Sequence, residues 1–575
     1  MNSILNKINY EVEFLLKRNE FNKIYDLLSN KRFSLLKDID LLKIYLLSSY
    51  IEKKYEFFLT LTNEILKKKI LDREIVFILI FIFYSSHKYM DAINLLNNFI
   101  NNNIERPKKN RIKIINKFMP IELLKINFKI KNEVNAFLLF GIYLRKAEFL
   151  DISLDIFEIL LRKIKNNYVI FFHSAKIYQK RKNYIKALAY IDSSLNINHN
   201  LEDAINTKAV ILIELCRYNE AYDLLTNVII TNKKNKYYYM NLGKILADRG
   251  NFKEAIVFFN KSLDLDKRDP KANYGKALCL LSLGEFNKSM KYLNFRMNGY
   301  LLSNEFLDKF NKPRLKNLDN LNNKKILIIF EQGFGDTLQF SRYLDKLSNM
   351  GAVIYFIPQK KLYDILKHLN KKIKIFSYDE KIPPYDFYLP LFDLPFLYYM
   401  KFKKFDNFHS YLNINKFNNS KFNKILNIKN FNIGICWKSN DDSDNKSFDL
   451  SNFSKISKIK NINLISLQLD DEDDIKKNKF NITPFAQFGV VNNFYNTAKI
   501  MKHLDLVISC DTSICHLSGS IGVSTWLLLK KVPDWRWLIK NETWYKDFLI
   551  FQQKYEFEWS DVFEEVYNKL IKIYN

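Results

Sequence analysis

The sequence predicts two kinds of structure in one chain: a helical repeat array over about residues 5–296, then an α/β region in two parts. Three observations predict this. Apolar residues recur every 34 positions in the first part, short apolar runs alternate with helical stretches beyond Leu301, and two glycines closely follow the first of those runs. A chain of 575 residues is too long for one hydrophobic core, so several domains are expected.

The repeat unit is marked by one aromatic and two small positions. The aromatic residues are Tyr184, Tyr218, Phe252 and Phe286, and small residues follow each of them at Ala187, Ala221, Ala255 and Ser289. A second small series has the same spacing, namely Gly141, Ala175, Ala209, Gly243 and Ala277. Small side chains at two fixed points of a 34-residue unit are what paired antiparallel helices need to approach closely.

These units resemble the tetratricopeptide repeat. The segments "YNEAYDLL" (218–225), "FKEAIVFF" (252–259) and "FNKSMKYL" (286–293) are similar to its second helix, and "NLGKILADRG" (241–250) to its first. Pro270 stands where the family favours proline at a repeat junction. The resemblance implies a solenoid that presents a surface to a protein partner.

The same phase extends toward the N-terminus in weaker form. Phe21, Tyr55 and Tyr89 are again 34 residues apart, and "YMDAINLL" (89–96) is the clearest segment. Residues 101–125, which include "RPKKNRIK", carry no repeat signature and are interpreted as a solvated basic insertion or an irregular repeat. We therefore expect degenerate repeats with an insertion over residues 1–125 and clearer repeats over 126–300.

The α/β region begins with a strand, helix and strand. The runs "KILIIF" (325–330) and "AVIYFI" (352–357) have the unbroken apolar character of buried parallel strands, and "DTLQFSRYLDKLSNMG" between them predicts an amphipathic helix that ends at Gly351. A second set consists of "NIGICW" (432–437), "INLISLQ" (462–468), "LDLVIS" (504–509) and "STWLLL" (524–529). Two Rossmann-like halves are expected, 322–415 and 430–575, with Pro383 to Asn430 as the joining region.

The glycines lie in the turn after the first strand, which contains Gln332, Gly333 and Gly335. In open α/β sheets ligands bind beyond the carboxyl ends of strands, and glycines there would permit a tight turn that brings backbone amides near a phosphate or sugar. Leu338 stands where a dinucleotide fingerprint needs glycine, and no phosphate-loop motif is present. This turn alone leaves a structural turn and a ligand loop equally open.

Six further segments occur in a fixed order: "EQGFGDTLQFSRYL", "YDFYLPLFDLP" (385–395), "IGICWKSN" (433–440), "LISLQ", "DLVISCDTSICHLSGSIGVSTWLLL" (505–529) and "VPDWRW" (532–537). Together they resemble the glycosyltransferases of the heptosyltransferase-like family, above all bacterial proteins that join tetratricopeptide repeats to such a domain. The likeness covers most of residues 322–555. It implies a GT-B fold, a nucleotide-sugar donor held mainly by the C-terminal half, and no required metal or other cofactor.

The resemblance assigns roles to two acidic positions. Asp336 matches the family's catalytic base, a role that suits a carboxylate because the attacking hydroxyl must lose a proton. The alternative is that Asp336 caps a helix beginning at Thr337. Asp511 and Thr512 match an Asp-Thr pair between a strand and a helix, where free amides and the helix dipole favour the donor's diphosphate.

Three further donor-site residues follow from the same alignment of motifs. Ser513 stands where the family often has glycine or alanine. His516 matches the family's His-Leu pair, either as a ligand contact or as a structural histidine. Lys446 matches a basic residue that neutralises the leaving diphosphate, with Lys438 as its rival. Asn496 departs from the family, whose members tend to have an acid there.

Other features are interpreted structurally. The acidic run "DDEDD" (470–474) is expected to be solvated, not a metal site. Trp535 and Trp537 are expected to pack in the core, although stacking on a nucleobase is an alternative. The five cysteines have no metal or redox spacing and are expected to be buried free thiols.

Charge and hydropathy bear on partners and location. The net charge of +28 comes from lysines spread along the whole chain, so a compositional bias explains it and no nucleic-acid partner is expected. The longest apolar run, Ile75 to Tyr84, is too short to cross a bilayer, so no transmembrane segment is expected. The N-terminal residues lack the pattern of a secretory signal, and the cytoplasm is the expected compartment.

The functional expectation is transfer of a sugar from a nucleoside-diphosphate donor to an acceptor hydroxyl on a protein or a glycan. The alternative is a non-catalytic interaction scaffold whose transferase-like domain has decayed. The feature that separates the two is whether Asp336, Lys446 and the Asp511 loop come together in the folded chain.

Overall fold

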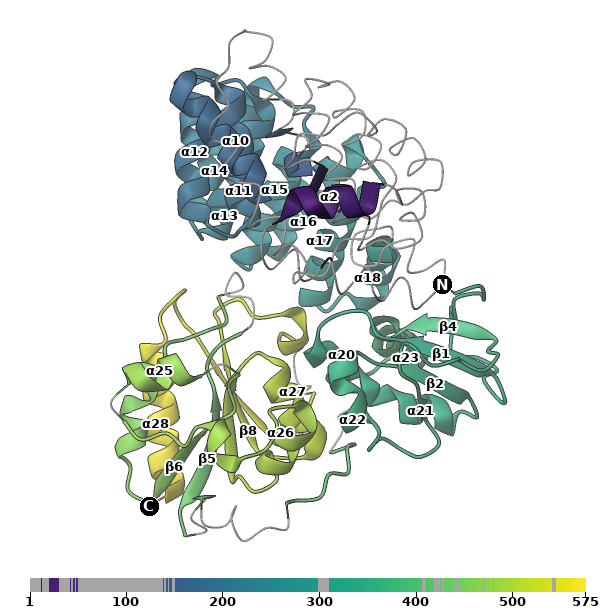
Figure 1. The fold of residues 1–575 in the computed structure, drawn as a ribbon. Coiled ribbons are helices and arrows are strands. Elements are labelled where there is room, and N and C mark those ends of the chain that lie inside the picture. Colours follow the sequence, from purple (N-terminus) through teal and green to yellow (C-terminus); the bar gives the residue numbers. More distant parts are fainter. Residues whose placement is uncertain are drawn as a thin grey trace. The chain divides into compact units, whose positions relative to one another are not determined.

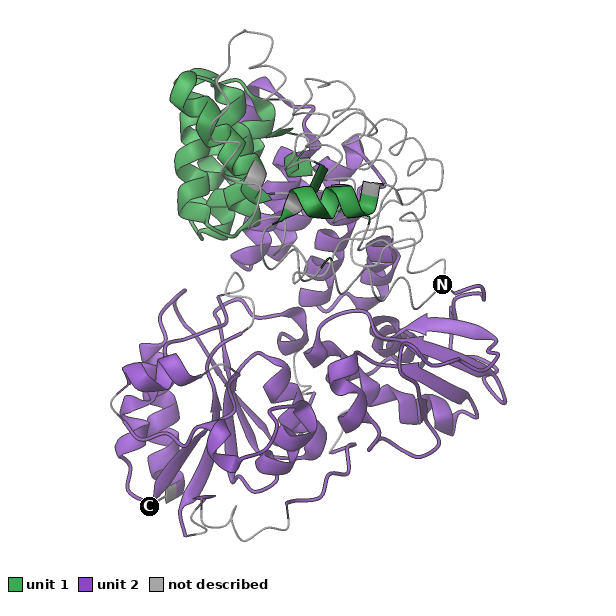
Figure 2. Ribbon diagram, viewed as in Figure 1, with its two compact units in different colours: residues 1–224 green, residues 225–575 purple. Residues whose placement is uncertain are grey.

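The computed structural model (Figure 1) describes residues 20–29, 150–297, 310–405, 410–417, 429–439, 445–469, 471–478, 480–539 and 544–574, with a few single positions elsewhere. The chain divides into two compact units, residues 1–224 and 225–575 (Figure 2). The predicted repeat positions Tyr55 and Tyr89 and the basic stretch 101–125 lie outside the described residues.

The repeat period is confirmed by the helix boundaries. The first unit contains α2 (Phe21–Ser29), α10 (Leu150–Lys163), α11 (Tyr168–Lys180), α12 (Tyr184–Ile197), α13 (Glu202–Glu214) and the start of α14 (Tyr218–Thr231). The second unit continues with α15 (Lys236–Asp248), α16 (Phe252–Leu265), α17 (Pro270–Ser282) and α18 (Phe286–Leu293). First helices begin at 168, 202, 236 and 270, and second helices at 184, 218, 252 and 286, so both series advance by 34 residues.

The small residue of the first helix packs against a large residue of the second helix, and the sizes of the two residues are complementary. A Cβ added to Gly243 would lie 2.9 Å from the Phe259 ring, and one added to Gly141 would lie 2.6 Å from the Phe157 ring. In repeats that have alanine at the small position, the residue that corresponds to Phe259 is smaller than phenylalanine. In the last repeat, for example, Ala277 corresponds to Gly243 and Leu293 to Phe259. A larger residue at one position is therefore compensated by a smaller residue at the other, so the helix pair stays closely packed.

We expect Gly243→Ala to lower the free energy of unfolding by about 1–3 kcal/mol, because the added methyl group collides with the Phe259 ring. This loss outweighs the gain of about 1 kcal/mol in helix propensity. The double variant Gly243→Ala/Phe259→Leu copies the Ala277–Leu293 pair and should lose less than the sum of its single changes. Urea unfolding measures all three, and a rise in stability for Gly243→Ala would contradict the packing argument.

The second residue after each first helix adopts the left-handed backbone conformation. These positions are Lys182 (φ 59°), Cys216 (φ 58°), Gly250 (φ 82°) and Gly284 (φ 75°). Glycine adopts this conformation without strain, whereas other residues lose roughly 1–2 kcal/mol. Two of the four repeats therefore carry strain at this position.

Lys182→Gly is expected to raise the free energy of unfolding by about 1 kcal/mol, because glycine removes the strain of the left-handed backbone. The matched control is Lys186→Gly in α12, an exposed helical position where glycine should lower stability by about 1 kcal/mol. Thermal unfolding of both variants tests the prediction. A loss of stability in both would show that the position tolerates lysine without strain.

The α/β region contains two parallel sheets, as predicted. The first has the order β3-β2-β1-β4 and consists of β1 (Lys325–Ile329), β2 (Val353–Ile357), β3 (Lys374–Ile375) and β4 (Phe387–Pro390). The second has the order β6-β5-β7-β8-β9 and consists of β5 (Phe431–Cys436), β6 (Ile462–Ser466), β7 (Leu506–Cys510), β8 (Thr525–Leu529) and β9 (Phe548–Gln552).

Two details of the sequence prediction are corrected here. Residues 387–390, which were placed in the joining region, form β4 and pair with Ile326–Ile329 of β1. The helix predicted between the first two strands is divided at Arg342 into α20 (Phe334–Ser341) and α21 (Tyr343–Asn349). Because α20 already begins at Phe334, Asp336 lies inside its first turn and does not precede it.

Helices cover both faces of the second sheet. Helices α26 (Phe494–Met501) and α27 (Ser513–Ile521) lie on one side, while α25 (Glu472–Lys477) and α28 (Ser560–Tyr574) lie on the other (Figure 1). The first sheet is accompanied by α20, α21, α22 (Tyr363–Leu366) and α23 (Leu394–Phe402). Burial on both faces explains why the strands are apolar without alternation.

Each sheet has one point where the strand order reverses. In the first sheet the chain proceeds outward from β1 to β2 and β3, then returns to place β4 on the other side of β1. In the second it proceeds from β5 to β6, then returns to place β7 on the other side of β5. Open α/β sheets bind ligands outside the carboxyl ends of the strands at such reversals.

The last repeat shares a hydrophobic core with the α/β region. Ala277, Phe286 and Leu293 belong to one buried cluster with Leu338 of α20 and Trp544. Directly after α18, in the short helix η2 (Asn294–Met297), the Arg296 guanidinium pairs with the carboxylates of Glu331 and Asp393. Residues on both sides of position 300 therefore share one core, and the compact unit that contains them begins at Leu225.

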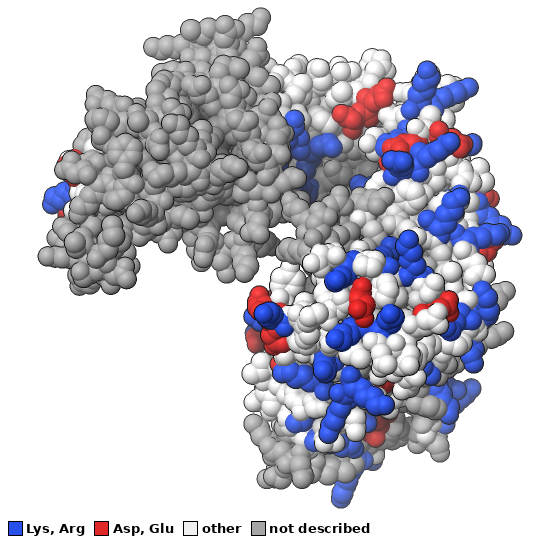
Figure 3. All heavy atoms as spheres, turned by 90° about the vertical axis from the view of Figure 1, so that its right-hand side faces the viewer, with Lys and Arg blue, Asp and Glu red and all other residues white. Residues whose placement is uncertain are grey.

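The surface carries the positive charge in dispersed form. On the face shown in Figure 3, the described Lys and Arg side chains are spread widely, with Asp and Glu between them. Exposed ion pairs such as Lys455–Glu564 reflect this mixture.

Candidate functional site

Helices α20 and α27 bring the reversal points of the two sheets together. Helix α20 follows β1, α27 follows β7, and the two helices pack against each other. A Cβ on Gly335 would lie 2.8 Å from Cδ2 of His516 and 3.5 Å from Cα of Ser513. Glycine at 335 thus permits the first turns of the two helices to meet.

A left-handed backbone does not explain the two glycines. Gly333 has φ −66°, and Gly335 is not among the described residues with a left-handed backbone. Neither position needs glycine to form the turn. Close helix packing explains Gly335, and the Gly333 amide serves as a donor to Asp336.

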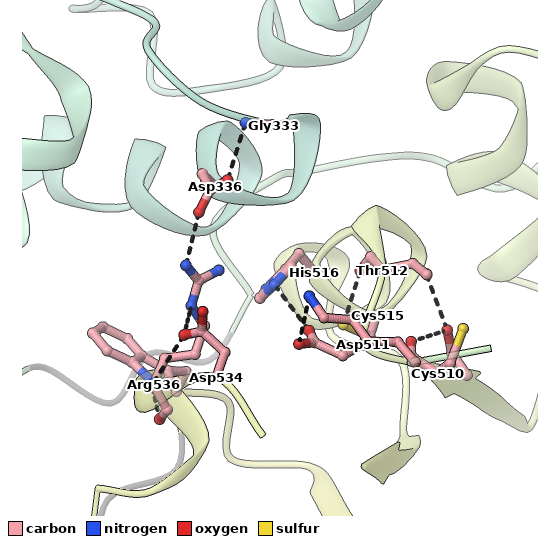
Figure 4. A network of polar contacts seen from close by, with 12 residues as sticks. Gly333, Asp336, Cys510, Asp511, Thr512, Cys515, His516, Asp534 and Arg536 are labelled. Atoms are coloured by element: carbon pink, nitrogen blue, oxygen red, sulfur yellow. Dashed lines mark hydrogen bonds and ion pairs between the residues drawn. The ribbon is translucent and has the colours of Figure 1, made fainter. Parts of the chain in front are cut away.

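Asp336 links the two halves of the α/β region. The Gly333 N–H donates to Asp336 Oδ2 at 3.0 Å, so the side chain stabilises the start of α20 from the third helical position. Arg536 Nη2 donates to Asp336 Oδ1 at 2.8 Å (Figure 4). The capping role is therefore present, and the second carboxylate oxygen points to an arginine of the opposite half.

Arg536 is the central residue that the sequence analysis did not select. It lies in the short helix η9 (Trp535–Trp537), its side chain is 10% exposed, and its Nε is 2.9 Å from Asp534 Oδ1. Although burial opposes its charge, Asp534, Asp336 and Asp511 raise the pKa of the guanidinium further above its ordinary value. The sequence feature that could have indicated Arg536 is the motif "VPDWRW", in which one cation lies between two tryptophans that are expected to be buried.

The Asp511 loop joins the same cluster. Asp511 follows β7, and the Lys446 Nζ lies 3.6 Å from its Oδ2 (Figure 4 shows the loop). Lys438 instead pairs with Asp474 at 2.5 Å. Of the two lysines that the sequence analysis weighed, Lys446 is therefore the one beside the Asp511 loop.

Helix α27 begins immediately after this carboxylate. Thr512 is its N-cap residue and Ser513 its first helical residue, but the Thr512 side chain makes no capping hydrogen bond. The Thr512 hydroxyl lies 3.4 Å from the Ser509 hydroxyl and 3.7 Å from the Cys436 thiol. The Thr512 side chain therefore does not cap the first-turn amides of α27.

His516 is packed within the protein. Its Nδ1 lies 3.0 Å from the Tyr545 hydroxyl, its ring stacks on Trp537, and it is 2% exposed. Burial, then the charges of Arg536, Arg342 and Lys446, lower the pKa of the imidazole well below its ordinary value. The side chain is therefore neutral near pH 7, and the structural interpretation of His516 is favoured.

Both tryptophans of the motif pack as expected. Trp535 is buried and lies against Phe396 and Trp544, while Trp537 stacks between His516 and Phe548. The interpretation of the acidic run is partly wrong, because Asp474 accepts a hydrogen bond from the Trp437 indole at 3.0 Å. All five cysteines are free thiols.

One group of side chains has the spacing of a metal site: ligand atoms of Asp511, Cys515 and His516 lie within 4.8 Å of one another. Its chemistry is unfavourable for a cation. Burial and Asp511 raise the pKa of the Cys515 thiol, and that thiol donates to the Thr512 carbonyl. Lys446 next to Asp511 adds a positive charge that a metal would have to overcome.

Gln332, in the turn between β1 and α20, connects the α/β region to the last repeat. Its side-chain amide donates to the Tyr274 hydroxyl at 3.5 Å, and Gln359 donates to its carbonyl at 2.8 Å. Tyr274 belongs to α17, which also contacts η9. The last repeat therefore borders the residues that hold Asp336 and Arg536.

Helical geometry and sequence comparison define the same class of protein. Residues 236–269 match the family model of the tetratricopeptide repeat, which corresponds to α15 and α16 with the turn after them. This segment therefore matches the tetratricopeptide repeat, and a parallel α/β region follows the helical repeats. None of the described helices is long and apolar enough to span a membrane.

Two curated relatives come from Methanocaldococcus jannaschii. "TPR repeat-containing protein MJ1428" is 30% identical over 134 residues, which are 23% of this chain and 24% of the relative. "TPR repeat-containing protein MJ0940" is 31% identical over 103 residues, which are 18% of this chain and 32% of the relative. The chain thus spans about a quarter to a third of the length of these relatives.

Solved structures with similar segments are also repeat proteins. One is described as "YrrB: a TPR protein with an unusual peptide-binding site", with 16% identity, a TM-score of 0.24, and coverage of 28% of this chain and 84% of that chain. MamA from Desulfovibrio magneticus RS-1 has 15% identity, a TM-score of 0.27, and coverage of 30% of this chain and 96% of that chain.

Proposed function

We propose that this protein is a metal-independent glycosyltransferase of the GT-B type, which uses a nucleoside-diphosphate sugar and takes its acceptor from a partner bound by the repeats. One observation carries the proposal. The Arg536–Asp336 ion pair lies at the start of α20 and the Lys446–Asp511 ion pair just before α27, and these two helices pack against each other after the strands at which both parallel sheets reverse their order. Repeats of this class present an extended surface to protein partners, which supports a protein acceptor.

The chemistry follows from the groups in this cluster. The acceptor hydroxyl oxygen forms a bond to the anomeric carbon of the sugar while the bond from that carbon to the diphosphate oxygen breaks. Asp336 takes the hydroxyl proton, and the bonding electrons leave with the diphosphate. In this proposal Lys446, Arg536 and the first amides of α27 stabilise the negative charge on that leaving group.

The test is binding of nucleoside diphosphates and nucleotide sugars, measured by calorimetry and thermal shift. Binding to the folded state should raise the melting temperature, since a ligand at 100 times its Kd adds about 2.7 kcal/mol. Lys446→Ala should weaken binding, whereas the matched control Lys438→Ala should not, because Lys438 pairs with Asp474. If no nucleotide binds wild type at millimolar concentration, the transferase proposal is wrong.

The second candidate is an interaction scaffold without transfer activity. One feature of the cluster favours this candidate: Lys446 and Arg536 already form ion pairs with the carboxylates of Asp511 and Asp336. The nucleotide screen separates the two functions. A protein that binds partners through residues 150–297 but no nucleotide would be a scaffold.

A further inference from the structure

We propose that Arg536 is a donor-responsive latch on Asp336: it pairs with this carboxylate before donor binds, then exchanges it for a phosphate of the donor. The inference rests on the proposed glycosyltransferase function and adds a role for a residue that links the two halves. In this scheme the candidate base becomes available only after the diphosphate has arrived.

The geometry of the guanidinium is the first step of the argument. Nη2 donates to Asp336 at 2.8 Å, and Nε lies 2.9 Å from Asp534 (Figure 4). These two nitrogens form one edge of the guanidinium, the kind of edge that arginine uses to grip a phosphate or carboxylate with two parallel hydrogen bonds. A phosphate that takes the same edge must displace at least one carboxylate.

The location of Arg536 limits where that phosphate can come from. Asp511, which begins the loop before α27, is close enough to raise the pKa of Arg536, and α27 packs on the α20 turn that holds Asp336. An anion at the first turn of α27 would therefore lie near the guanidinium. The positive end of a helix dipole and an arginine are the groups that bind diphosphates elsewhere in proteins.

The charge balance gives the exchange its driving force. Asp336, Asp511 and Asp534 contribute three negative charges, whereas Arg536 and Lys446 contribute two positive ones. Such a cluster repels a diphosphate unless a cation turns from its carboxylate to the ligand. The energy needed to separate Arg536 from Asp336 then reduces the apparent affinity for the donor.

This arrangement predicts that removing the competing carboxylate tightens nucleotide binding. Asp336→Asn keeps the side-chain shape and can still accept from Gly333, but it loses the charge that holds Arg536. We expect its affinity for the nucleoside diphosphate that wild type binds to rise about tenfold, within the usual range of coupling between two sites. Arg536→Met should bind the same nucleotide at least tenfold more weakly.

A double-mutant cycle separates the latch from a general charge effect. In the Arg536→Met background no guanidinium remains to be released, so Asp336→Asn should change the affinity less than twofold. Asp364→Asn, whose carboxylate is 70% exposed and pairs with Lys367, is the matched control and should leave affinity unchanged. Melting temperatures of all variants verify that each one is folded.

Calorimetric titration with the nucleoside diphosphate gives distinct outcomes. Tightening that requires Arg536 supports the latch. Tightening of equal size in both backgrounds, or no tightening in Asp336→Asn, overturns the latch while leaving the transferase proposal intact. Failure of wild type to bind any nucleoside diphosphate overturns both.

Discussion

Replacing Arg296 with methionine is expected to lower the free energy of unfolding of the C-terminal unit by about 3–5 kcal/mol. Arg296 is 1% exposed, and its Nε and Nη2 donate to Glu331 at 2.5 Å and 3.0 Å. Nη2 also donates to Asp393 at 2.7 Å. Methionine leaves two buried carboxylates, of which Asp393 keeps its ion pair with Arg314 while Glu331 loses the hydrogen bonds from Arg296.

The loss is large because of where these carboxylates lie. Burial raises the pKa of Glu331, while Arg296 opposes that rise. Without Arg296 the folded state must either keep an unpaired buried charge or protonate Glu331, and both options cost free energy relative to water. Because Glu331 and Asp393 follow β1 and β4, the damage reaches the reversal point of the first sheet.

Urea unfolding followed by tryptophan fluorescence measures the effect. All six tryptophans lie between Trp437 and Trp559, and Trp535 and Trp544 share a core cluster with Leu293 of the last repeat. The exposed control Lys288→Met removes a charge from the same repeat and should change stability by less than about 0.5 kcal/mol.

A compensating change distinguishes charge from shape. The double variant Arg296→Met/Glu331→Met removes one cation and one anion and leaves Asp393 paired with Arg314. It should recover most of the lost stability, since apolar residues often replace buried ion pairs without loss. If Arg296→Met were as stable as wild type, the ion pairs of Arg296 would contribute nothing to the stability of the unit that contains the last repeat.

The proposed glycosyltransferase function predicts that Asp336→Asn lowers the rate of sugar transfer by about 10²–10⁴-fold, since asparagine cannot accept the hydroxyl proton. The change should appear in kcat, while the protein stays folded, because asparagine can still accept the Gly333 amide hydrogen bond. Asp364→Asn removes an exposed carboxylate of the same half and should retain wild-type turnover. Transfer of a radiolabelled sugar to acceptor, at saturating donor, measures both variants.

Two results would contradict this assignment. Turnover of Asp336→Asn within threefold of wild type would show that another group takes the proton. A melting temperature of Asp336→Asn low enough to unfold the protein in the assay would attribute the loss of turnover to structure and reduce Asp336 to a structural role.

The sequence predicted the repeats well because their signal is local. A 34-residue period places the same residue type at the same helix crossing, as Ala187, Ala221, Ala255 and Ser289 show by their complete burial. The parallel strands were also recognisable, since burial on both faces requires continuous apolar runs. Strand β4 was missed because its sequence, "FYLP", ends in proline and is short.

The candidate site depends on pairings that no local pattern carries. Arg536 and Asp336 are 200 residues apart, and Arg296 and Asp393 are 97 apart. One arginine in a lysine-rich chain has no periodicity that could indicate its partner. The role of Gly335 likewise depends on His516, which a distant helix places against it.

The sequence by itself determined the helix pairs, most of the strands and their parallel arrangement, because each of these follows from apolar spacing over a few tens of residues at most. Only the tertiary structure decided which charges meet. Carboxylates and guanidinium groups are brought into contact by the packing of whole elements, and their energies depend on burial and distance. The chemistry of this protein is therefore determined by the positions of α20, α27 and η9, which place Asp336 beside Arg536.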